Sequence, residues 1–149
     1  MLVLRNATIN DMHQYFSWTN DEFVRLNSIS VKIIAWEEHQ KWFKNKLNDK
    51  NSFLYLAKNK QNLIGQVRFD CGNSRAVISY SIANNFRGLG LAKKMLKQAI
   101  EKISKDCPRI EIIKAKIKIT NITSNKVLIR LGFVEQDKTK QIVTYQLEL

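Results

Sequence analysis

A glycine-rich corner between a strand-like segment and a helix-like segment constrains this chain more than any other feature. The corner, NNFRGLGLAKKM at residues 84–95, follows alternating apolar residues at 75–82 and precedes apolar residues spaced four apart at 91–103. Alternation predicts a strand, and the fourfold spacing predicts a helix that begins at Gly88 or Leu89. Glycines let the backbone approach a ligand closely, and the unpaired first-turn N–H groups of a helix attract phosphate. The corner is therefore a candidate phosphate site.

Two familiar phosphate-binding patterns fit this corner poorly. A P-loop needs GxxxxGK followed by Ser or Thr, which the corner lacks, and a dinucleotide-binding GxGxxG needs a glycine where Lys93 stands. Two simpler interpretations stay open from the residues alone. The amides of Leu89 to Ala92 bind a pyrophosphate at the start of the helix, or the glycines only form the turn that caps it.

The rest of the chain alternates between strand-like and helix-like segments. Strands are expected at residues 2–7, 52–58, 63–70, 75–82, 109–120, 133–137 and 141–149. Helices are expected within residues 8–26 with Asn10 or Asp11 as the cap, at 35–47, from the corner to Pro108, and at 124–131 before Gly132. This order predicts a mixed α/β fold with two helices before the second strand, in a single domain of residues 1–149. The strand–helix–strand unit around the corner is expected to be a parallel crossover.

The charge of the chain favours anionic partners. Lysine and arginine outnumber acidic residues 25 to 13 over 149 residues, for a net charge of +12, and such a charge attracts nucleic acid or phosphate-rich small molecules. Lysine made abundant by AT-rich codon usage explains the same charge without a function. Lys114, Lys116 and Lys118 share one face of their strand with no aromatic residues between them, so nucleic acid is not the expected partner.

Cysteine and histidine usage argues against several classes of site. Cys71, Cys107, His13 and His39 show no CxxC spacing and no cluster, so no metal site is predicted. Two unpaired thiols favour a reducing, cytoplasmic compartment. The polar N-terminus lacks the apolar core of a signal peptide, and no apolar segment approaches the roughly 20 residues that span a bilayer. No membrane partner is expected.

Two ordered motifs resemble those of the GNAT superfamily of N-acetyltransferases. Residues 87–92, RGLGLA, match the Arg/Gln-x-x-Gly-x-Gly/Ala signature, and NITSNKVLIRLGF at residues 121–133 resembles the second marker, an Asn followed by a helix that ends in Gly-Phe. The predicted elements also follow the order of that family over nearly the whole chain. The resemblance implies a mixed, mostly antiparallel central sheet with helices on both faces and a parallel strand–helix–strand unit at the cofactor site.

The resemblance also implies acetyl-CoA as co-substrate and assigns positions to it. In such proteins the corner binds the diphosphate, and the pantetheine arm lies beside the preceding strand as an added strand would. The positions assigned in this way are Tyr80, Ser81, Ile82, Arg87, Gly88, Leu89, Gly90, Leu91, Ala92, Asn121 and Asn125. For Asn121 the alternative is a residue that only caps the last helix.

One position departs from the pattern of the family. Many relatives carry a tyrosine in the last helix, four residues before the Gly-Phe pair, as the acid that protonates the leaving thiolate; this chain has Leu128 there. Tyr80, Ser124, Tyr145 or a water are the candidates for that role. Backbone amides at the end of the 75–82 strand are candidates to polarise the thioester carbonyl.

Two segments before the sheet point to the acceptor. W-x-N-D-x-x-V-R, from Trp18 to Arg25, and H-x-x-W-F, from His39, resemble segments of acetyltransferases that modify amino-sugar nucleotides for bacterial surface glycans. On this hypothesis Trp18 stacks on a sugar or base, Arg25 pairs with a phosphate from the same helix face, and His39 is a possible base. The alternative is core packing for Trp18 and His39 and a surface pair of Arg25 with Glu22.

The first hypothesis is therefore an N-acetyltransferase acting on a small-molecule amine, with an amino-sugar nucleotide as the acceptor. A second hypothesis is acetylation of a protein N-terminus, because ribosomal-protein acetyltransferases share the N-x-x-S form of the last motif. A third is a non-catalytic module that binds CoA or nucleic acid, which the missing tyrosine allows. The chain is expected to act as a monomer or homodimer.

Overall fold

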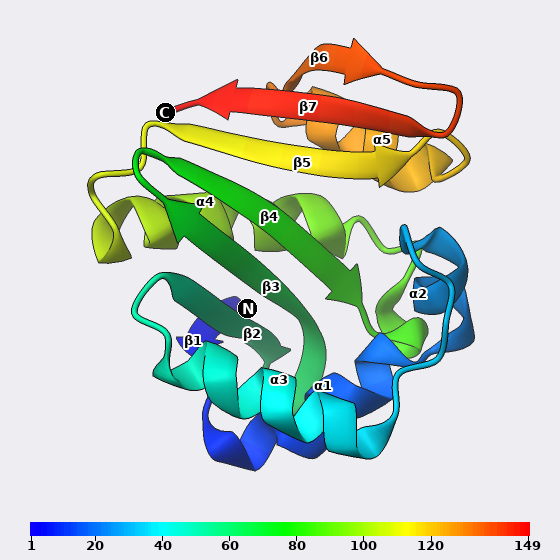
Figure 1. Cartoon of the computed structure of the whole chain (residues 1–149), viewed down its shortest axis with the longest axis vertical. Helices are drawn as coiled ribbons and strands as arrows, with labels where there is room; N and C mark the ends of the chain where they lie inside the picture. Colours follow the sequence, from blue (N-terminus) through cyan, green and yellow to red (C-terminus); the bar gives the residue numbers. More distant parts are fainter.

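The computed structural model describes residues 1–149 and confirms the mixed, mostly antiparallel sheet (Figure 1). The seven strands are β1 (Leu2–Asn6), β2 (Ser52–Asn59), β3 (Asn62–Gly72), β4 (Arg75–Ile82), β5 (Ile112–Lys118), β6 (Val134–Lys138) and β7 (Ile142–Glu148). They form one sheet in the order β1-β2-β3-β4-β5-β7-β6. The β4–β5 pair is parallel and the other pairs are antiparallel, as the crossover at the corner predicts.

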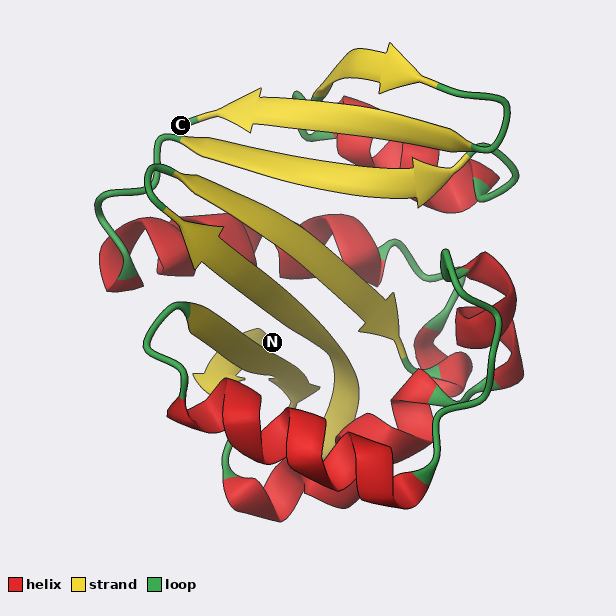
Figure 2. Cartoon of the chain, viewed as in Figure 1, coloured by secondary structure: helices red, strands yellow, loops and turns green.

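Helices cover both faces of this sheet (Figure 2). They are α1 (Met12–Thr19), α2 (Glu22–Asn27), α3 (Trp36–Asn48), α4 (Leu91–Asp106) and α5 (Ile122–Arg130), with short 3₁₀ turns at η1 (Ile9–Asp11) and η2 (Asn84–Phe86). Side chains alternate between the two faces along each strand, so neighbouring residues pack into different cores. In β2, Leu54 and Leu56 pack with α1 and α3, whereas Tyr55 and Ala57 face the larger core that α4 and α5 cover.

The prediction of a single helix within residues 8–26 is wrong, because a break at Asp21 divides this segment into two helices. Asp21 has φ −55° and ψ 135°, which is not helical, and its carboxylate accepts a hydrogen bond from the N–H of Val24 at 3.2 Å. That contact caps a new helix, α2, so three helices precede β2 instead of two. Trp18 lies in α1 and Arg25 in α2, and they do not share a helix face.

The corner also differs from its prediction, because α4 begins at Leu91 and not at Gly88 or Leu89. Gly88 has φ 76° and Gly90 has φ 73°, values outside the right-handed helical region. A right-handed helix therefore begins only after Gly90. The last helix differs in the other direction: α5 begins at Ile122, earlier than expected, because the side chain of Asn121 accepts a hydrogen bond from the N–H of Ser124 at 3.3 Å.

The parallel strands β4 and β5 separate part of the way along their length. Their register runs from Arg75 opposite Ile112 to Val77 opposite Lys114 and stops there, although β4 continues to Ile82 and β5 to Lys118. The neighbouring pairs β3–β4 and β5–β7 remain intact beyond this point. The sheet therefore opens between β4 and β5 next to the corner.

Gly65 keeps β3 close to β4 near this opening. A Cβ at Gly65 would lie 2.3 Å from the carbonyl oxygen of Ser81 and 3.3 Å from the sulfur of Met95, so no side chain fits there. We expect Gly65→Ala to lower the free energy of unfolding by about 1–3 kcal/mol, because the backbone must move. Gly72→Ala, in the same strand with nothing within 4 Å of the added Cβ, is the matched control. Urea denaturation of both variants measures the difference, and equal stabilities would contradict the packing argument.

Candidate active site

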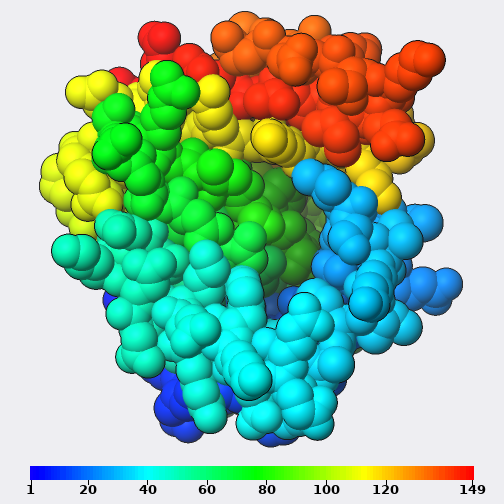
Figure 3. Space-filling model, in the orientation of Figure 1, coloured from blue at the N-terminus to red at the C-terminus, as the bar shows by residue number.

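A cavity of about 680 Å³ occupies the opening between β4 and β5. The start of α4, the first turn of α5, and α2 with the loop after it form its other sides. In the space-filling view the recess lies among the green, light-blue and yellow segments (Figure 3). Ligand cavities usually span roughly 300–1,000 Å³, so this one has room for an extended arm and a small second substrate.

The corner presents a row of unpaired backbone donors to this cavity. The N–H groups of residues 88–93 donate to no acceptor within the chain, and the predicted free amides of Leu89 to Ala92 are among them. A Cβ added at Gly88 or Gly90 would meet nothing within 4 Å, so space remains beside the backbone. Free amides at the N-terminus of a sixteen-residue helix are suited to a diphosphate.

The exposed edge of β4 offers a second set of backbone groups. The N–H of Ala83 donates to the carbonyl of Ile64 in β3 at 2.7 Å. Because backbone groups alternate along a strand, those of Tyr80 point the other way, into the gap that β5 leaves. Lys116 of β5 has no strand partner on the facing side of that gap. An arm with two amides fits such an edge as an added strand does.

Arg87 of the signature is held by the protein itself. Its Nε donates to the carbonyl of Ile82 at 3.0 Å, and one terminal nitrogen pairs with the carboxylate of Asp21 at 2.6 Å. The other terminal nitrogen donates to the side chain of Asn84 at 3.3 Å, and the guanidinium lies 4.5 Å from the ring centre of Phe23. Backbone amides, rather than the side chain of Arg87, are the free donors at the corner.

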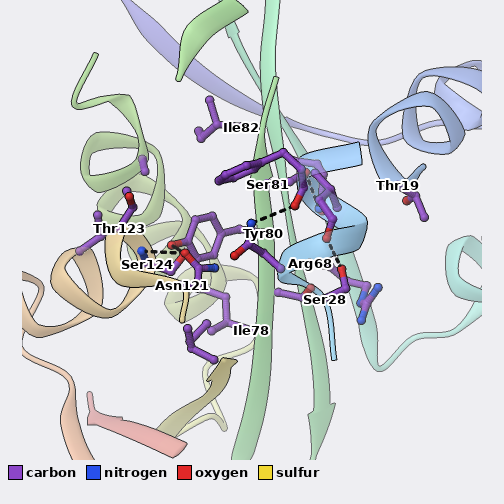
Figure 4. Close-up of a pocket in the computed structure, with 18 of the residues that line it drawn as sticks. Thr19, Ser28, Arg68, Ile78, Tyr80, Ser81, Ile82, Asn121, Thr123 and Ser124 are labelled. Atoms are coloured by element: carbon purple, nitrogen blue, oxygen red, sulfur yellow. Dashed lines mark hydrogen bonds between the residues drawn. The ribbon is translucent and has the colours of Figure 1, made fainter. Parts of the chain in front are cut away.

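Tyr80 and Ser124 meet across the opening (Figure 4). The hydroxyl of Tyr80 donates to Oγ of Ser124 at 2.6 Å, and both residues line the cavity. Burial raises the pKa of Tyr80, against a smaller lowering by the hydrogen bond to Ser124, so the phenol stays protonated at neutral pH. Because Oγ of Ser124 accepts this bond, its own hydrogen is free to point elsewhere.

The other candidate acid lies outside the cavity lining. Tyr145 of β7 is 4% exposed and donates to the side-chain oxygen of Asn125. Asn125 in turn donates to the carbonyls of Lys118 and Asn121 at 3.0 and 2.7 Å, so it ties α5 to the sheet. Leu128, at the position of the usual tyrosine, is fully buried in the core. Asn121 caps α5, as the alternative interpretation expected, and it also lines the cavity.

The three acceptor candidates take different places. Trp18 of α1 is 8% exposed. It packs in the smaller core between α1, α3 and β2 and does not line the main cavity. His39 lines the cavity but is 1% exposed, and its Nε2 donates to the carbonyl of Met12 at 2.9 Å. Burial lowers the pKa of His39, so the ring is neutral at pH 7. Arg25 lines the cavity with its guanidinium bound to the carbonyls of Thr19, Ser30 and Lys32.

Sequence reasoning missed the electrostatic character of the cavity. Six cationic side chains line it against one acidic side chain, Glu38. The cations are Arg25, Arg68, Arg87, Lys93, Lys116 and Arg130. Alternation in residues 63–70 was one available signal, because it sets Gln66 and Arg68 opposite the buried Val67 and Phe69. Alternation in β5 was a second signal, because it sets Lys116 on the face opposite the buried Ala115.

The structure contains neither a metal-binding cluster nor a membrane-spanning helix. No group of three or more histidine, cysteine, aspartate or glutamate side chains is arranged to hold a metal ion. None of the helices combines the length and apolar character that crossing a membrane requires.

Solved structures with this fold include several acetyltransferases. A spermidine N-acetyltransferase from Vibrio cholerae, in complex with CoA and spermine, has a TM-score of 0.88 at 16% identity, over 99% of this chain and 95% of that one. An aminoglycoside acetyltransferase in complex with CoA has 0.83 at 16%, over 99% and 95%. A ribosomal-protein alpha-N-acetyltransferase in complex with CoA has 0.84 at 18%, over 99% and 94%. The TM-scores show that the chain shares the fold of these proteins, and at such low identities the likeness concerns the fold alone.

The family comparison uses the sequence directly. No match was found among curated proteins. The family model of the acetyltransferase (GNAT) domain matches residues 1–134, which include the corner, the opened sheet and the α5 marker up to Phe133. The chain therefore belongs to the GNAT family and is an N-acetyltransferase that uses acetyl-CoA.

Proposed function

We propose that this enzyme acetylates the amine of an anionic small molecule, and that an amino sugar linked to a nucleotide is the acceptor class. The observation that carries the proposal is the charge of the cavity, with six cations against one exposed acid. Spermidine and aminoglycosides are polycations, and a site for them needs carboxylates. Arg87 and Lys93 belong to the corner, so the remaining cations favour an acceptor with phosphate groups of its own.

Arg68 is the cation best prepared to meet such an acceptor. Its Nε pairs with Asp70 at 2.9 Å, and its guanidinium lies 5.1 Å from the ring centre of Trp42. These contacts orient the guanidinium group, whose two terminal nitrogens have no hydrogen-bond partner in the chain. The guanidinium of Arg25 is occupied by backbone carbonyls, so we assign the phosphate contact to Arg68 instead. A rigid fork with free donors suits bidentate binding of phosphate.

The Tyr80–Ser124 pair supports a route for the proton that acetyl transfer requires. Acetyl-CoA supplies an activated acetyl group, and its transfer to the amine forms an N–C bond, breaks the C–S bond and leaves a thiolate. Ser124 lies in the first turn of α5, where the helix dipole favours negative charge. Its hydroxyl donates a proton to the thiolate, and the phenol of Tyr80 donates a proton to Ser124 along their 2.6 Å hydrogen bond. The amine loses one proton to water as the N–C bond forms, and a proton from water restores the phenol, so the number of protons is conserved.

The corner predicts the first functional result. Gly90→Glu places a side chain and a negative charge among the free amides, so we expect CoA to bind roughly ten- to a hundredfold more weakly. Gly132→Glu is the control, because Gly132 also has a positive φ, 96°, but lies outside the cavity lining. Isothermal titration with CoA compares the two variants. Equal affinities would show that the corner does not bind the cofactor.

The proton route predicts the second result. Ser124→Ala is expected to lower kcat by about a hundredfold, and Tyr80→Phe by about tenfold, with little change in CoA affinity. Tyr145→Phe, which removes a buried hydroxyl outside the cavity, is expected to keep the parent kcat. Single-turnover release of the free thiol measures all three. Full activity in Ser124→Ala would assign the proton to water.

The third prediction concerns the proposed acceptor class. We expect turnover with nucleotide-linked amino sugars. A screen that measures release of the free thiol compares them with spermidine, an aminoglycoside and a peptide with a free N-terminus. Arg68→Gln should raise the KM for that acceptor by roughly ten- to a hundredfold. Arg75→Gln, which removes an exposed cation of β4 outside the cavity, should leave KM unchanged. Turnover of spermidine or the peptide alone would refute the acceptor class and leave the cofactor site untouched.

A further inference from the structure

Residues 21–34, here called the acceptor wall, comprise α2 and the loop that follows it. The wall forms one side of the cavity, yet none of the side chains of α2 is buried. Three of its apolar side chains are largely exposed, with Leu26 at 66%, Ile29 at 63% and Ile33 at 72%. Segments that bury so little apolar surface open locally at a small fraction of the global free energy of unfolding.

Polar contacts therefore hold the wall in place. Within the wall region, Arg25 binds backbone carbonyls, and Asn20 exchanges two hydrogen bonds with the backbone of Ile34 at 2.8 and 2.9 Å. One bond comes from β5, where Nζ of Lys118 donates to the carbonyl of Leu26 at 2.9 Å. One ion pair joins the wall to the rest of the protein, and it runs from Asp21 to Arg87 at 2.6 Å.

This ion pair connects the wall to the cofactor corner. Asp21 is the N-cap of α2, and Arg87 directly precedes the row of free amides at residues 88–93. The same guanidinium is fixed to the corner side by the carbonyl of Ile82 and stacks on Phe23 of the wall. The pair is half-buried, with side-chain exposures of 21% and 26%, so solvent screens it less than a surface pair.

We propose that Arg87 is a positioning residue that couples the two substrate sites: cofactor bound at the corner orders the acceptor wall through the Arg87–Asp21 ion pair. A diphosphate bound to the amides after Arg87 restrains the backbone that carries this side chain. The restraint passes to Asp21 and so to the start of α2. By linkage, an acceptor that orders the wall must strengthen cofactor binding by the same factor. The inference rests on cofactor binding at the corner.

Hydrogen exchange of the full-length protein, with and without saturating CoA, tests the coupling. In the parent protein CoA should slow exchange at residues 88–95 and, by about fivefold or more, at residues 22–34. Asp21→Asn keeps a side chain that caps helices well but removes the charge. In this variant the slowing at 88–95 should persist, and the slowing at 22–34 should disappear. Glu22→Gln, the neighbouring acid with no ion pair, is the control and should behave as the parent.

Each other outcome has a definite meaning. If CoA still protects residues 22–34 in Asp21→Asn, the Arg87–Asp21 ion pair does not carry the coupling and the proposal is wrong. No protection of residues 22–34 in the parent also overturns it. No protection at residues 88–95 removes the corner as the cofactor site, and the coupling with it, which separates that failure from the other two. Unchanged exchange in β2 and β3 verifies that each variant is folded.

Discussion

The backbone hydrogen bonds between β4 and β5 extend over three residue pairs, from Arg75–Ile112 to Val77–Lys114, and then end while both strands continue. Unpaired backbone groups in a sheet interior are costly unless a partner replaces the missing strand. Here the backbone groups of Tyr80 on one side and Lys116 on the other border the cavity, where they are available to pair with an extended ligand. The positions of the corner, α5 and the acceptor wall all follow from this opening.

The groups that attract anions differ between the corner and the rest of the cavity. At the corner the attraction for anions comes from backbone amides, because the guanidinium of Arg87 already binds Asp21 and the carbonyl of Ile82. Farther along, Arg68 and Lys116 carry donors that the protein does not use. This arrangement differs from what a polycationic acceptor such as spermidine requires. The likeness of fold to a spermidine enzyme is thus compatible with a different acceptor.

The proposed proton donor lies at a different position from the tyrosine of the family pattern. Leu128 occupies the position of the usual tyrosine and is fully buried in the core against α4. A phenol instead reaches the start of α5 from β4, where Tyr80 donates to Ser124. Burial keeps this phenol protonated at neutral pH, since it raises the pKa of Tyr80. The pair therefore offers a hydroxyl in the first turn of α5, four residues before Leu128.

Local patterns by themselves determined the strands, the parallel crossover, the glycine corner and the marker at Asn121, because alternation, helical spacing and positive-φ glycines act over a few residues. They did not determine the break at Asp21, since its capping bond to Val24 competes with a helix pattern that continues through it. Tertiary structure alone decided that Trp18 is core and that Tyr80 meets Ser124, 44 residues away. Those outcomes depend on contacts between distant elements, which no local spacing encodes.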